Sequence, residues 1–211
     1  MNNKEEIHNH CRNYLPHIEN KRYQMITFRL YDSVPREVIE RWKREVDDGV
    51  RASSPPNFPN FLNPPTQRAG SPHSKLVLID KYEDSGAGQC FMRDDREAQI
   101  VKDTLFYYDG DKYNIIAWCI MPNHVHILIM LLKAVSLSEI IHSWKSYSAK
   151  QINKLLNRKG QVWMMEYFDR FIRDSDHYEK VVNYIHNNPV KAGLVTSPSE
   201  YRWCSAFEKR H

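Results

Sequence analysis

Two histidines, His124 and His126, flank a valine inside the apolar stretch 115–132 (IIAWCIMPNHVHILIMLL). Successive side chains of a β-strand point to opposite faces, so the two imidazoles share one face and Val125 lies on the other. Imidazole is a common ligand of divalent metal ions. The rest of that face, Leu128 and Met130, is apolar. The pattern indicates a two-residue metal chelate, and the alternative is a buried histidine pair that is hydrogen-bonded within the core.

A candidate partner for this pair lies further along the chain. Tyr184 and Asn188 are four residues apart in a segment with helical character, so they share one helix face, and Pro189 is expected to stop the helix just beyond them. That face offers a phenol and an amide oxygen. The alternative for the tyrosine is packing in the core with its hydroxyl satisfied.

The elements that position these residues follow an α+β pattern. Alternation, helical periodicity and turn residues predict a strand, a helix, two adjacent antiparallel strands, a long helix, a further strand and a last helix. A ferredoxin-like fold, with a central antiparallel sheet and helices packed on it, is the simplest match. The expected ranges are strands at 22–30, 113–120, 124–132 and 161–172, helices at 33–49, 94–109, 136–157 and 174–189, a helix or strand at 75–85, and an extended segment at 89–92.

The chain reads as one domain with additions. We expect a polar N-terminal segment at 1–21, the domain at 22–206 and a tail at 207–211. Six of the eleven prolines fall in 50–73, which predicts an irregular insertion. The start of the chain has no apolar signal region, and no apolar run is long enough to span a bilayer, so neither export signal nor membrane anchor is expected. The four cysteines lack zinc-finger spacing, which favours a reducing cytoplasm.

Positive charge is concentrated in the second part of the chain. Residues 133–211 carry thirteen Lys and Arg against eight Asp and Glu, whereas residues 1–132 carry seventeen against eighteen. A basic region beside a metal chelate suits a partner with a phosphate backbone. The alternative is an ordinary solvated surface.

Four motifs, in order along the chain, resemble one known family. They are 117–127 (AWCIMPNHVHI), 144–147 (WKSY), 166–174 (EYFDRFIRD) and 184–195 (YIHNNPVKAGLV). Together they resemble the REP-associated tyrosine transposases, relatives of single-strand insertion-sequence transposases in the HUH superfamily, over about Tyr23 to Ala206. The resemblance implies a bacterial cytoplasmic protein whose substrate is DNA of the nucleoid.

The resemblance also implies roles for the four polar residues. His124, His126 and Asn188 are expected to bind one divalent metal, Mg²⁺ or Mn²⁺, and Tyr184 is expected to be the nucleophile. The implied activity is metal-dependent cleavage and strand transfer of single-stranded hairpin DNA through a covalent 5′-phosphotyrosine. The implied assembly is a monomer or homodimer. The strand that carries the histidines must then face the helix that carries Tyr184 and Asn188.

Residues near the motifs are candidates for DNA contacts, as phosphate ligands or as stacking partners for bases. They are Lys145, Arg170, Arg173, Lys191, Trp144 and Trp163. Where relatives commonly have Trp-Gln, this chain has Trp163-Met164, which puts the DNA specificity in doubt rather than the chemistry.

Two other functions are compatible with parts of the pattern. A regulatory protein could bind hairpin DNA or RNA without cutting it, although such a protein has no physical reason to keep all four polar residues. A water-activating metallohydrolase usually needs further His or Asp ligands near the histidine pair, and 127–132 supplies none.

Overall fold

The computed structural model describes residues 23–33, 86, 88–132 and 135–208. The expected N-terminal segment, the helix beyond Ser33, the proline-rich insertion and the element at 75–85 lie outside the described residues. The described elements are β1 (Tyr23–Arg29), η1 (Phe91–Arg93), α3 (Asp95–Phe106), β2 (Tyr113–Ile120), β3 (His124–Leu131), α4 (Leu137–Leu155), β4 (Phe168–Phe171), α5 (Ser175–Lys191), η2 (Pro198–Glu200) and α6 (Ser205–Glu208). The expected domain end at 206 therefore falls within α6.

The four strands form one antiparallel sheet in the order β2-β3-β1-β4. β3 and β1 are central, and their register places Thr27 opposite His126 and Arg29 opposite His124. β2 and β3 are joined by a tight turn in which the Met121 amide donates to the His124 carbonyl. A β-α-β-β-α-β chain with this strand order is a ferredoxin-like arrangement, so the expected fold class is confirmed.

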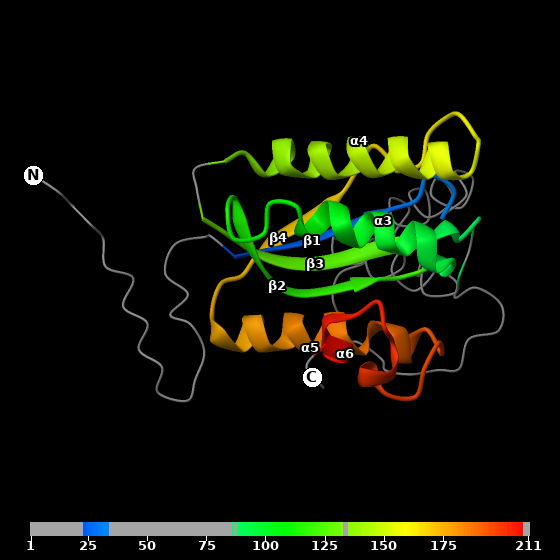
Figure 1. The fold of residues 1–211 in the computed structure, drawn as a ribbon. Helices are drawn as coiled ribbons and strands as arrows, with labels where there is room; N and C mark the ends of the chain where they lie inside the picture. The colour runs from blue at the N-terminus through cyan, green and yellow to red at the C-terminus, as the bar shows by residue number, and fades with distance from the viewer. Residues whose placement is uncertain (1–22, 34–85, 87, 133–134, 209–211) are drawn as a thin grey trace, which may run out of the picture.

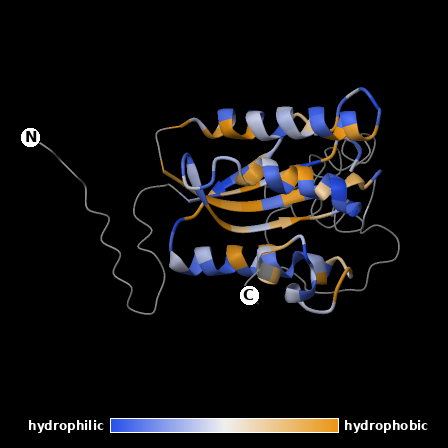
Figure 2. Ribbon diagram, viewed as in Figure 1, coloured by the Kyte–Doolittle hydropathy of each residue, from blue (hydrophilic) through white to orange (hydrophobic). Residues whose placement is uncertain are grey.

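Helices cover both faces of the sheet (Figure 1). α3 and α4 pack against each other and against one face, and α5 packs on the other face, mainly on β2 and less on β3. The strands between the two helix layers carry mainly hydrophobic colours in Figure 2, as a sheet covered on both sides requires. No helix among the described residues has the length and apolar character needed to cross a membrane.

β3 divides its side chains between two cores, as its sequence predicts. Val125, Ile127 and Ile129 belong to the core formed with α3 and α4. Leu128 belongs to the second core, which includes Ile185 of α5. The alternation of a strand therefore places His124 and His126 on the α5 side of the sheet.

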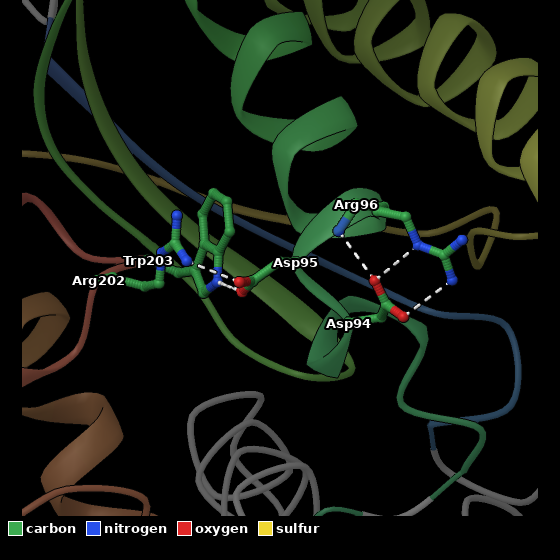
Figure 3. A network of polar contacts seen from close by, with 5 residues as sticks. All are labelled: Asp94, Asp95, Arg96, Arg202 and Trp203. Atoms are coloured by element: carbon green, nitrogen blue, oxygen red, sulfur yellow. Dashed lines mark hydrogen bonds and ion pairs between the residues drawn. The ribbon is translucent and has the colours of Figure 1, made fainter.

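The C-terminal segment is held against α3 and β2. Figure 3 shows Asp95, at the start of α3, accepting from Arg202 Nη1 at 2.6 Å and from Trp203 Nε1 at 2.9 Å. Beside it, the Asp94 carboxylate caps the helix by accepting from the Arg96 amide. The Ile120 amide of β2 also donates to the Trp203 carbonyl. These bonds hold the C-terminal segment along the edge of β2 that does not pair with β3.

Two expected extended segments are largely irregular. Residues 89–92 are not a strand, because Cys90 has a left-handed backbone (φ 49°) and Phe91–Arg93 form a 3-10 turn. Of the strand expected at 161–172, only Phe168–Phe171 pair in the sheet, apart from a bridge between Trp163 and Leu30. Between these two points, the carbonyls of Met165 and Glu166 accept hydrogen bonds from Lys145 Nζ and not from the backbone of a neighbouring strand.

Two details of the helix ends also differ from expectation. The sequence 136–139 (SLSE) has the pattern of a capping box, but Ser136 Oγ bonds to Ser138 Oγ and caps no backbone amide. Pro189 does not stop α5, which continues to Lys191. A proline in the last turn removes one hydrogen bond, and the Ala192 and Leu194 amides close the end of the helix on the carbonyls of Asn188 and Pro189.

A buried chain of hydrogen bonds joins α4, β2 and α3. Trp144 Nε1 donates to Tyr113 Oη at 2.8 Å, and Tyr113 Oη donates to the Leu105 carbonyl at 2.6 Å. Tyr113 is fully buried, and this burial raises the pKa of its hydroxyl to about 12. The hydroxyl therefore stays protonated and links both neighbours.

We expect Tyr113→Phe to lower the free energy of unfolding by about 2 kcal/mol, because the indole N–H and the Leu105 carbonyl both lose their partner in the core. Urea unfolding followed by tryptophan fluorescence measures the change. Tyr107→Phe is the matched control, since Tyr107 is 75% exposed, and it should change stability by less than about 0.5 kcal/mol. Equal stability of the two variants would contradict the assignment.

Candidate active site

The two histidines lie side by side in the middle of the molecule. His124 and His126 are each 1% exposed, and their ring centroids are 4.6 Å apart. Both rings lie between β3 and α5, on the face that also carries Thr27 and Leu128. Burial of two adjacent imidazoles costs solvation free energy, and apolar side chains at these positions would avoid that cost.

Each imidazole is held through its Nδ1 atom. His124 Nδ1 lies 2.8 Å from the side-chain oxygen of Asn123, and His126 Nδ1 lies 2.7 Å from Thr27 Oγ1. Both contacts are buried. They leave Nε2 as the atom by which each ring can bind a metal.

α5 brings the tyrosine and the asparagine to the histidines. The ring of Tyr184 packs against His126 at a centroid distance of 5.2 Å. Asn188, one turn further, is fully buried, and its oxygen and nitrogen have no hydrogen-bond partner of normal geometry among the described residues. The expected placement is therefore confirmed within one subunit: the strand with the histidines faces the helix with Tyr184 and Asn188.

Burial keeps both histidines neutral. It lowers the pKa of His124 to about 3, an effect that the nearby Asn188 amide opposes and the positive charge of Arg29 reinforces. The pKa of His126 is also well below its usual value, chiefly through burial and then through electrostatic interaction with the adjacent His124 ring and with Lys191. A neutral imidazole keeps a lone pair for a metal at neutral pH.

The donor set suits a divalent cation. The two imidazoles are adjacent and the buried Asn188 amide lies beside His124, and its oxygen has no hydrogen-bond partner of normal geometry among the described residues. No group of three His, Cys, Asp or Glu residues able to hold a metal occurs among the described residues. Asn188, whose buried amide lies beside His124, is a residue that could add a third ligand to the two imidazoles.

Positive side chains border the site. Lys191, two turns after Tyr184, places Nζ 4.4 Å from the centroid of its ring. Arg29 lies opposite His124 in the β1–β3 register, and its side chain shares the α5 face of the sheet. Arg170 of β4 pairs with Met25 on the same face, and Arg173 lies near His177 at the start of α5. These side chains thus lie on the α5 face of the sheet or near the two ends of α5.

Three of the expected DNA contacts lie elsewhere. Trp144 and Trp163 are core residues, 1% and 4% exposed, and their indole N–H groups donate to Tyr113 Oη and Ser148 Oγ. A base cannot stack on either ring without opening the core, so the expectation that these indoles stack on bases does not fit their burial. Lys145 is on α4, across the sheet from the histidines, and its ammonium binds two carbonyls. Its burial lowers its pKa to about 8.

Three residues beside the histidines were not predicted from the sequence: Thr27, Asn123 and Arg29. Thr27 and Arg29 are polar residues at alternate positions of the first strand, where Tyr23 and Met25 are apolar. The change from apolar to polar side chains along one face of this strand is the sequence feature that could have identified them. Asn123 directly precedes the histidine pair, in the turn between β2 and β3.

Known proteins resemble the chain in sequence and in fold. Residues 75–188, slightly more than half of the chain, match the family described as "Transposase IS200 like". A REP-associated tyrosine transposase of Escherichia coli (strain K12) is 28% identical over 89 residues, and a provisionally named REP-associated tyrosine transposase of Haemophilus influenzae is 24% identical over 103 residues. The matches cover 42% and 44% of this chain but only 52% and 58% of those relatives.

A solved structure has the same fold. It is a REP-associated tyrosine transposase bound to a REP hairpin, with a TM-score of 0.51 and 18% identity, and the match covers 92% of this chain and 82% of that one. The family match includes β2, β3 and α4 and ends at Asn188, so it contains the histidine pair, the tyrosine and the asparagine. The chain therefore belongs to the family of IS200-like transposases.

Proposed function

We propose that this protein is a metal-dependent single-stranded DNA endonuclease and strand transferase that uses Tyr184 as its nucleophile. The observation that carries the proposal is the packing of Tyr184 against His126, with Asn188 beside His124. A phenol, two neutral imidazoles and a buried amide meet where β3 faces α5. Such a set has no evident structural purpose, because an apolar core would avoid the cost of burying it.

His124, His126 and Asn188 are the residues that would hold a divalent metal, Mg²⁺ or Mn²⁺. Oxygen and imidazole ligands suit both ions, and three protein ligands leave positions for phosphate oxygens. When bound, the metal supplies charge neutralisation and orientation of the scissile phosphate. The protein contributes neutral ligands, a site largely shielded from water, and a nucleophile on a rigid helix.

The reaction transfers one DNA phosphoryl group from a 3′-oxygen to the oxygen of Tyr184. The Tyr184 oxygen attacks phosphorus, a bond from phosphorus to that oxygen forms, and the bond from phosphorus to the 3′-oxygen breaks. The phenol gives up its proton, and the departing 3′-oxygen takes one up. The products are a 5′-phosphotyrosine and a free 3′-hydroxyl, and no water is consumed. Because the ester is retained, attack by another 3′-hydroxyl can rejoin strands without ATP.

The proposed substrate is single-stranded DNA with a hairpin. A protein with the same fold has been solved bound to a REP hairpin. Lys191, Arg29 and Arg170 provide positive charge beside the proposed site, where a DNA backbone must pass for a phosphate to reach Tyr184.

The covalent intermediate gives the most direct test. Wild-type protein with labelled single-stranded hairpin DNA and Mn²⁺ should yield a protein–DNA adduct that survives denaturing electrophoresis, and Tyr184→Phe should yield none. Tyr178→Phe is the matched control, because Tyr178 lies on the same helix and packs against Tyr23 away from the histidines. It should keep the adduct. An adduct in Tyr184→Phe refutes the mechanism, and hairpin binding without any adduct favours a regulatory binding protein.

Asn188→Leu should separate stability from activity. Removal of a buried amide whose atoms have no partner of normal geometry among the described residues is expected to leave the metal-free protein as stable as the wild type or about 1 kcal/mol more stable. Loss of the third ligand should weaken Mn²⁺ binding at least about tenfold and abolish Mn²⁺-dependent cleavage. Thermal unfolding and titration calorimetry measure the two effects. Cleavage at the wild-type rate would exclude Asn188 as a ligand.

DNA binding should depend on the charges of the α5 face. Lys191→Gln should weaken binding of single-stranded hairpin DNA and reduce the slope of log affinity against log salt by about 0.7–0.9, because one phosphate contact is lost. Lys145→Gln is the matched control, since its ammonium lies across the sheet and binds backbone carbonyls. Fluorescence anisotropy over a range of NaCl concentrations measures both. A larger loss of DNA affinity in Lys145→Gln than in Lys191→Gln would place the DNA on the α4 side of the sheet.

A further inference from the structure

We propose that Thr27 and Asn123 are positioning residues, which hold the two histidines in the ring orientation and tautomer that expose Nε2 to the metal. The inference rests on the proposed function, since it assumes that the histidines bind a divalent cation. It assigns a purpose to the hydrogen bonds of 2.8 Å and 2.7 Å at the two Nδ1 atoms. Neither residue contacts the metal or the substrate in this proposal.

Asn123 is fixed by the backbone around it. Its carbonyl accepts from the Leu30 amide, and the neighbouring Pro122 carbonyl accepts from the Met92 amide. The side chain is 1% exposed and directs its oxygen to His124 Nδ1. An amide oxygen can only accept, so Nδ1 must carry the proton. The Nε2 atom of a neutral ring then has the lone pair.

Thr27 performs the same task from a different strand. It lies opposite His126 in the β1–β3 register and is also paired with Phe168 of β4, so the sheet fixes its backbone on both sides. Its hydroxyl and His126 Nδ1 are both buried. A hydroxyl can donate or accept. If His126 binds the metal through Nε2, its Nδ1 carries the proton and the Thr27 hydroxyl must accept from it. The hydrogen bond then holds the ring with Nε2 directed to the metal.

Each of the two contacts holds one ring of the pair, and the two come from different parts of the chain. Asn123 precedes His124 in the β2–β3 turn, whereas Thr27 reaches His126 from β1. Each imidazole would otherwise be free to exchange Nδ1 and Nε2 by rotation about its side chain. Hydrogen bonds to the distal nitrogen of a metal-binding histidine typically contribute 10–100-fold in metal affinity. We expect contributions of about that size here.

A purely structural role is the competing explanation. Any buried ring nitrogen needs a partner, and a threonine or an asparagine can provide one without reference to a metal. The two explanations differ in what a substitution changes. A structural partner affects the stability of the metal-free protein, whereas a positioning residue affects metal affinity beyond any change in stability.

The test is Mn²⁺ binding to the full chain without DNA, measured by titration calorimetry. Thr27→Val removes the hydroxyl and keeps the shape, and Thr27→Ser restores the hydroxyl. Thr104→Val is the matched control, because Thr104 is as buried as Thr27 but bonds to a carbonyl within α3. We expect Thr27→Val and Asn123→Leu to weaken Mn²⁺ binding about 10–100-fold, Thr27→Ser to recover most of the loss, and Thr104→Val to bind as the wild type does.

The outcomes separate this inference from the function on which it rests. Wild type that does not bind Mn²⁺ overturns both. Wild type that binds Mn²⁺, with Thr27→Val and Asn123→Leu binding equally well, overturns only the positioning role. If these variants do not fold, ¹⁵N NMR of histidine-labelled wild type decides. A proton on Nδ1 of both rings in the metal-free protein supports the inference, and a proton on Nε2 of either ring overturns it.

Discussion

The packing of α5 across β3 is the interaction on which the site depends. It covers two imidazoles and one amide that would otherwise be solvated, and it leaves Tyr184 at the margin of the covered region. Burial is the main cause of the depressed pKa of both histidines. The same contact that completes the second core therefore also sets the protonation state of the proposed metal ligands.

A central strand of a ferredoxin-like sheet is well suited to this arrangement. Its two faces serve different layers, so Val125, Ile127 and Ile129 can stabilise the α3–α4 core while the alternate positions carry polar groups. β1, the other central strand, brings Thr27 and Arg29 to the same face by its register alone. Two adjacent strands thus supply both histidines and two of the polar side chains around them.

The predictable part of this molecule is local in sequence. Strand alternation placed both histidines on one face, and the four-residue spacing placed Tyr184 and Asn188 on one side of a helix. The errors concern long-range partners. Nothing near Trp144 shows that its indole bonds to Tyr113, and nothing near Lys145 shows that two carbonyls will bind its ammonium. Thr27 and His126 are 99 residues apart, so only the register of the sheet reveals their contact.

The asparagine distinguishes a binding site from a core. Each buried polar group without a partner costs about 1–3 kcal/mol. Both amide atoms of Asn188 lack a partner of normal geometry among the described residues, beside rings that already cost free energy to bury. Selection for stability alone would favour an apolar residue at this position. A cation that binds the amide oxygen recovers part of this cost only in the folded protein, so binding adds to stability in proportion to its affinity. The burial of the Asn188 amide, which costs stability in the metal-free protein, is therefore explained by the proposed metal binding.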